Sequence, residues 1–180
     1  STPVYMFGFH VQTVFRDGTM FVQVRGKSRL SYIVLIYGCA VIIAFIAVIL
    51  VIFAGIIYTC MIKSLSFLKV LTYIMEARTF LGLHFLVILL FENLMIVLLC
   101  YRVNSIFIFY AYVLMYMLYF FPYVEFMKYW PVGMATLTRI GNIFANNDNM
   151  KIGEYIGLCE MLLLNGIVYI IGLFKNGRKR

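Results

Sequence analysis

Residues 31–57 form an apolar run without a single charged side chain, and this run constrains the fold more than any other feature. About 20 such residues cross the hydrocarbon core of a bilayer as a helix. Lipid offers the backbone no hydrogen-bond partners, so the run must be helical despite its many valines and isoleucines. The whole chain agrees, because it is 64% hydrophobic and 12% charged, whereas soluble domains have about 45–50% and about 25%. The sequence therefore predicts an integral membrane protein.

Three later apolar stretches predict further spans. Pro122 ends the middle one, because proline cannot continue the backbone hydrogen bonding of a helix. Residues 58–80 mix apolar with charged side chains, which fits either an amphipathic interfacial segment or the start of the next helix. The four expected spans lie near residues 31–57, 81–101, 105–121 and 153–174.

The expected fold class is thus all-α, a polytopic transmembrane helical bundle of about four spans. We expect residues 31–180 to form this bundle with its short basic C-terminal tail, and residues 1–30 to form a cytoplasmic segment before it. In the last span Gly153, Gly157 and Gly166 would allow another helix to approach closely.

Basic residues are concentrated beside the first span and after the last. Loops rich in lysine and arginine stay in the cytoplasm, so an even number of spans places both termini there. The net charge of +8 is then explained by this topology and by contact with anionic lipid headgroups. We therefore expect membrane lipid as a partner and no nucleic acid. We expect the chain in a bacterial cytoplasmic membrane. The membrane-entry basic cluster before the first span consists of Arg25, Lys27 and Arg29.

The triplet Gly26-Lys27-Ser28 is not part of a nucleotide-binding loop. Such a loop needs a further glycine five positions before Gly26, and Phe21 stands there. We also find no cysteine pair with metal-ligand spacing and no pattern of a protease or acyl transferase. The chain is therefore not expected to be an enzyme, and no catalytic residue, metal or cofactor is assigned to it.

We single out four polar side chains inside the expected spans. Ionisable residues are costly in a membrane and commonly mark a functional site. The functional interpretation is a polar relay or a substrate contact inside the bundle. The alternative is a hydrogen bond between helices, or a residue at a helix end that reaches the interface. These intramembrane candidates are Glu92, Asn93, Glu160 and Asn165.

The order of features resembles the permease subunits of type-2 ABC exporters. In that family a cytoplasmic stretch with Gly-Thr and then Ser-Arg precedes a long span, and here Asp17-Gly18-Thr19 and Ser28-Arg29 precede residues 31–57. An outer segment with a proline follows, here "FMKYWPVGM", and then a last span with a basic tail. Two spans normally precede the Gly-Thr stretch, so the resemblance implies the C-terminal portion or a truncated form of a permease.

The resemblance also implies partners. A separate ATP-binding subunit would supply ATP and dock on the cytoplasmic face. A second permease subunit, identical or different, would complete the path for a peptide, lipid or drug-like substrate. The implied ATPase-coupling residues are Phe15, Arg16, Asp17, Gly18 and Thr19.

Two other functions fit the same composition. One is a structural membrane subunit of a large respiratory-type complex, because such subunits are also apolar, aromatic and poor in charge. The other is an ion or proton carrier that uses Glu92 and Glu160.

Overall fold

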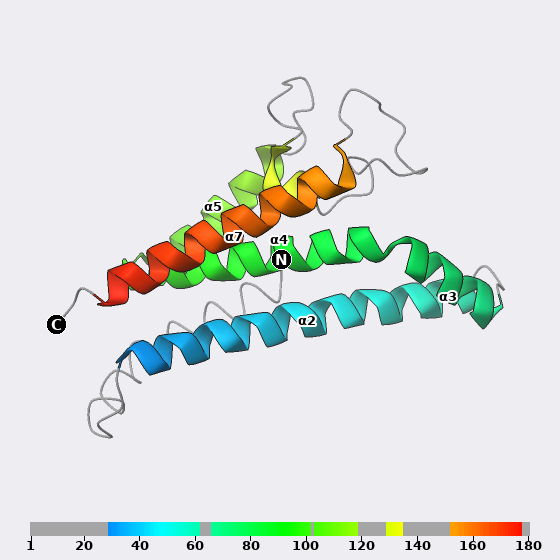
Figure 1. Ribbon diagram of the computed structural model, residues 1–180, viewed down its shortest axis with the longest axis horizontal. Helices are drawn as coiled ribbons and strands as arrows, with labels where there is room; N and C mark the ends of the chain where they lie inside the picture. The colour runs from blue at the N-terminus through cyan, green and yellow to red at the C-terminus, as the bar shows by residue number, and fades with distance from the viewer. Residues whose placement is uncertain (1–28, 62–65, 102, 119–128, 135–151, 178–180) are drawn as a thin grey trace.

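The computed structural model describes residues 29–61, 66–101, 103–118, 129–134 and 152–177. In these residues the architecture is helical throughout (Figure 1). The elements are α2 (Arg29–Met61), α3 (Phe67–Glu76), α4 (Arg78–Cys100), α5 (Ser105–Leu118), α6 (Pro131–Met134) and α7 (Glu154–Gly177).

Three of these helices are long and apolar enough to cross a membrane. The segments that qualify are Val34–Met61, Arg78–Leu99 and Glu154–Phe174, and they match three of the four spans expected from the sequence. Helix α5 has 14 residues and is therefore about 21 Å long, which is less than the about 30 Å of a hydrocarbon core. Since residues 119–121 lie outside the described part of the chain, the fourth span stays a prediction.

Helix α4 lies at the centre of the bundle, and the other helices pack around it. Figure 1 shows α2 running from left to right and α4 returning beside it, with α7 parallel to α4. Helix α5 runs opposite to α4. Its central position makes α4 the most buried of the long helices, whereas α2 and α7 expose most of their apolar side chains.

Small residues let α2 approach the bundle. Ala40, Ala44 and Ala47 are buried and recur at the spacing that puts side chains on one face of a helix. In lipid, helices associate mainly through close packing and hydrogen bonds, which favours small residues at the contact. The opposite face of α2 is exposed and apolar, with Leu35 61% and Ile42 60% accessible, as suits a surface against lipid.

The ambiguous segment 58–80 resolves partly into a helix of its own. Helix α3 exposes Leu68, Lys69 and Thr72 and buries Val70. A single residue, Ala77, separates it from α4, and the Ala77 N–H donates to the carbonyl of Tyr73 at 2.9 Å. The segment therefore contains a short separate helix, α3, that leads into α4 through one residue.

The polar break after α4 sets the start of α5. The Asn104 side-chain oxygen accepts a hydrogen bond from the Ile106 N–H at 3.1 Å, which caps a helix terminus whose backbone donors otherwise lack partners. Two further contacts hold α5 in place. Phe91 and Tyr112 pack edge to face at 4.4 Å between centroids, and Trp130 donates from Nε1 to the Met115 carbonyl at 2.9 Å.

Candidate functional site: a buried polar cluster in α4 and α7

A hydrogen bond between two asparagine side chains joins α4 to α7. Asn93 donates from Nδ2 to Oδ1 of Asn165 over 3.1 Å, and the two residues are 4% and 7% exposed. Asn165 is 11 residues from the first residue of its helix and 12 from the last, so the bond lies near mid-length. A bond at this depth joins the two helices where a membrane would be most apolar.

The side chain of Asn165 is occupied by its neighbours. Its Nδ2 donates at 2.9 Å to the Leu86 carbonyl of α4 and at 2.9 Å to the Met161 carbonyl of α7, while Oδ1 accepts from Asn93. An amide has two N–H donors and one carbonyl, so each of these groups has a partner. Asn165 thus links the two helices by hydrogen bonds, and its polar groups are not free to bind a ligand.

Glu92 is fully buried, with 0% of its surface exposed. Neither carboxylate oxygen has a hydrogen-bond partner among the described residues, and neither has Oδ1 of Asn93. Buried polar groups nearly always have partners, so three unpaired acceptors at adjacent positions call for an explanation. An isolated ionised carboxylate is strongly destabilising in an apolar interior, which means that its charge must be balanced by a proton or a cation.

The helical geometry of α4 places Glu92 between two of its neighbours. Consecutive residues of an α-helix project about 100° apart. Phe91 meets Tyr112 of α5 and Asn93 meets Asn165 of α7, so Glu92 projects between the α5 side and the α7 side.

The basic residues of α4 and α7 lie several helical turns along the chain from Glu92 and Asn165. Helix α4 carries Arg78 as its first residue, and α7 carries Lys175 near its end. Arg78 is 14 positions before Glu92, and Lys175 is ten positions after Asn165, which corresponds to about 21 Å and about 15 Å along the helices. A counter-charge from these helices is therefore out of direct reach.

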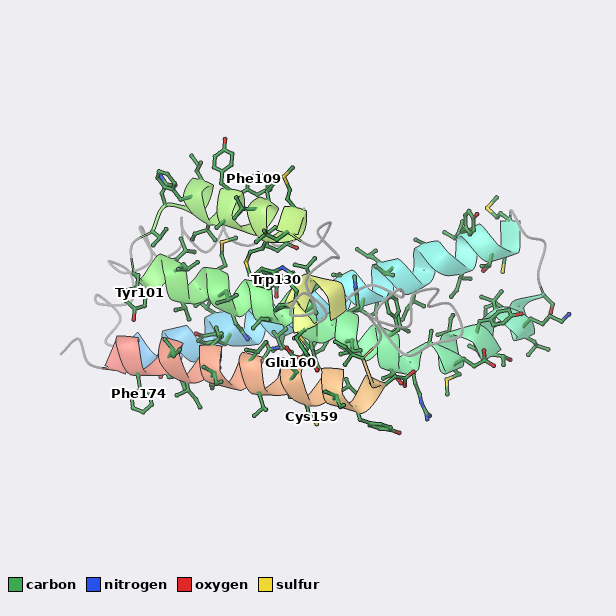
Figure 2. The ribbon with its side chains drawn as sticks, turned by 90° about the horizontal axis from the view of Figure 1, so that it is seen from above. Tyr101, Phe109, Trp130, Cys159, Glu160 and Phe174 are labelled. Atoms are coloured by element: carbon green, nitrogen blue, oxygen red, sulfur yellow. The ribbon has the colours of Figure 1, made fainter. Side chains whose placement is uncertain are left out.

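Glu160 occupies a different setting from Glu92. It is half-buried on α7, and Figure 2 shows it on the side of α7 that faces α4 and α6, whereas Cys159 and Phe174 point away from the bundle. The structure thus joins Asn93 and Asn165 directly, with the buried Glu92 next to Asn93 along α4, whereas Glu160 is half-buried on α7.

Of the ATPase-coupling and membrane-entry candidates, only Arg29 lies within the described residues. Phe15, Arg16, Asp17, Gly18, Thr19, Arg25 and Lys27 lie outside the described residues. Arg29 is the first residue of α2, directly before the apolar run, as a membrane-entry residue would be. Its assigned role, like the coupling role of residues 15–19, stays a prediction.

A close contact near Gly172 escaped the sequence analysis. A Cβ at this position would collide with the Tyr37 hydroxyl and would lie 3.2 Å from Cγ2 of Val97. Tyr37 is also packed edge to face on Tyr169, at 4.7 Å between centroids. The glycine therefore lets α2, α4 and α7 meet at one point. The available signal was the residue type alone, and Gly166, which the sequence favoured, faces open space.

The described part of the chain defines a class of protein: it is helical, with three helices long and apolar enough to span a membrane, and its central helix carries a buried carboxylate. No protein-family model matches the chain, and neither does any curated protein or solved structure. The likeness to type-2 ABC exporter permeases rests on the sequence features described above.

Proposed function

We propose that this chain is a subunit of a membrane transport protein and that α4 and α7 form the part that handles the transported charge. Glu92 carries the proposal: it is wholly buried, and both its oxygens lack a partner among the described residues. A group that serves packing alone is more stable as an apolar side chain of similar volume. Retention of a carboxylate at this depth is typical of ion and proton paths.

The proposed topology follows from the direction of the helices. The start of α2 and the ends of α4 and α7 lie at one end of the bundle, on the left in Figure 1. The basic residues of the sequence flank the same points, with Arg29 at the start of α2 and Lys175 near the end of α7. We place this end in the cytoplasm, with α5 as a fourth span, in a bacterial cytoplasmic membrane.

The test is ion movement through the purified protein in proteoliposomes. A pH gradient or a sodium gradient is imposed, and flux is followed with a pH-sensitive dye or with labelled sodium. We expect flux above that of empty liposomes of the same lipid composition. Flux equal to that of empty liposomes under both gradients, with the protein inserted and helical by circular dichroism, would remove the carrier proposal.

A second candidate is the permease subunit of a type-2 ABC exporter, moving a peptide, lipid or drug-like substrate. It is favoured by Asp17-Gly18-Thr19 followed by Ser28-Arg29 before a long span. Here a separate subunit would bind ATP, and a second permease subunit would complete the path.

The permease candidate is tested by affinity purification in mild detergent. A nucleotide-binding subunit should copurify, and Asp17→Ala combined with Thr19→Ala should loosen it more than the control Lys27→Ala does. Equal loss from Lys27→Ala would argue against the coupling role of residues 15–19. Recovery of respiratory subunits alone would favour the third possibility, a structural subunit of such a complex.

A further inference from the structure

The atoms of the buried cluster that have no hydrogen-bond partner among the described residues are all acceptors. Its unpaired atoms are the two carboxylate oxygens of Glu92 and Oδ1 of Asn93, while both N–H groups that Asn165 directs at its neighbours are already used. Acceptor oxygens bind a proton, a metal cation or a donor group, and they repel anions. The chemistry of the site therefore selects for positive charge.

The surrounding groups support the same selection. The lysine and arginine residues with described side chains are Lys69 on α3 and Arg78 on α4, and both are exposed, whereas Glu92 is buried. An incoming cation would thus meet one carboxylate and no competing positive charge from these elements. Titratable side chains on α4 and its described neighbours include Arg78 and His84 on α4, Glu154, Glu160 and Tyr169 on α7, Tyr110 and Tyr112 on α5, Tyr37 on α2, Lys69, Tyr73 and Glu76 on α3, and Tyr129 just before α6.

We propose that Glu92 and Asn93 form a binding site for a small, desolvated monovalent cation, either a proton or an alkali metal ion such as sodium. Both species satisfy a carboxylate through oxygen alone, and both are small enough for a fully buried position. The inference deepens the proposed transport function by naming its substrate class.

A proton and an alkali metal ion differ in whether they need Asn93 as a ligand. A proton binds one carboxylate oxygen and needs nothing from the neighbouring amide. An alkali metal ion needs several oxygen ligands, so the unpaired Oδ1 of Asn93 would join the carboxylate in holding it. The role of Asn93 therefore separates the two sources of charge.

Chemical modification with dicyclohexylcarbodiimide tests binding directly. This apolar reagent partitions into membranes and adds the O–H of a carboxylic acid across one of its C=N bonds, so it modifies the protonated acid and not the carboxylate. The purified full chain in detergent is treated in a series of buffers from acidic to alkaline, with sodium chloride or with choline chloride. Mass spectrometry of peptides then measures the modified fraction at each glutamate.

We expect Glu92 to be modified in acidic buffer and progressively less as the pH rises. A further loss of modification with sodium but not choline identifies a metal ion, and a response to pH alone identifies a proton. Glu76, which is exposed on α3, is the internal control, and Glu92→Gln must abolish the modified peptide. No modification of Glu92 at any pH, or modification that neither pH nor sodium changes, would overturn the proposal.

Two variants make the assignment sharper. If sodium is bound, Asn93→Ala should remove the protection by sodium while modification in acidic buffer persists; if a proton is bound, the pH response should survive this change. Asn165→Ala also breaks the Asn93 hydrogen bond but keeps the Asn93 oxygen. It therefore controls for loss of the hydrogen bond between α4 and α7. Because the assay needs no flux, a protein that binds a cation but transports none would refute the transport function and leave this inference standing.

Discussion

The hydrogen bond between Asn93 and Asn165 allows a quantitative test of the helix pairing. Asn165→Leu keeps similar volume but removes two bonds to α4, from Asn93 and to the Leu86 carbonyl. Hydrogen bonds between membrane helices contribute about 0.6 kcal/mol each on average, with a maximum near 1.7. The Asn93 amide also loses its partner while buried, which costs about 1–3 kcal/mol. The variant should therefore lose roughly 2–4 kcal/mol of unfolding free energy.

A double-mutant cycle isolates the bond between the two side chains. Asn93→Leu, Asn165→Leu and the double variant are unfolded by denaturing detergent in mixed micelles, and helicity is followed by circular dichroism. The coupling energy should be about 0.6 kcal/mol or more, because the double variant leaves no unpaired amide behind. Cys159→Ala, on the exposed face of α7, is the control and should change stability little. Additive single costs, with no coupling, would refute the contact.

Three further predictions concern packing and α5. Gly172→Ala should destabilise the fold by about 1–3 kcal/mol in the same assay, since its Cβ would strike Tyr37. Its control is Gly166→Ala, which has open space around it and should be neutral or stabilising by up to about 1 kcal/mol. Equal effects of the two variants on stability would contradict the placement of Gly172. Ala44→Leu, at a position with 0% exposure, should also cost about 1–3 kcal/mol through overpacking, and Ala54→Leu on the exposed face of α2 should not. Trp130→Phe loses the bond to the Met115 carbonyl and should cost about 0.5–1.5 kcal/mol; an unchanged midpoint would show that the bond contributes nothing.

The long helices were predictable because their signal is local. Residues 31–57 lack any charge, and lipid forces such a run into a helix. The helix boundaries were less so: α2 begins at Arg29 and continues to Met61, beyond the expected end of the run. The start of α5 at Ser105 follows a cap by Asn104, a role that a sequence indicates only when the first turn is already known.

The polar candidates were found as single residues and not as a cluster. Glu92, Asn93 and Asn165 stand out in apolar surroundings, but which of them meet depends on which faces of α4 and α7 pack together. That choice depends on contacts between residues far apart in the sequence, such as Gly82 of α4 and Leu158 of α7.

The small residues of α2 indicate a helix contact that was not predicted from the sequence. Ala40, Ala44 and Ala47 repeat on one helical face, and such stripes are typical of contacts between membrane helices. The glycines of the last span, Gly153, Gly157 and Gly166, were predicted to make the close contacts instead. Of these, Gly157 is buried, whereas the closest approach occurs at Gly172, since helix packing follows the facing surface and not the number of glycines.

The central claim, that Glu92 handles the transported charge, is tested most directly by flux through matched variants. Glu92→Gln keeps the shape of the buried side chain and removes its charge, while Glu76→Gln makes the same change at an exposed position on α3. In proteoliposomes with equal amounts of inserted protein, proton or sodium flux should fall to the level of empty liposomes for Glu92→Gln and stay at the unmodified level for Glu76→Gln. Unchanged flux in Glu92→Gln would contradict the claim.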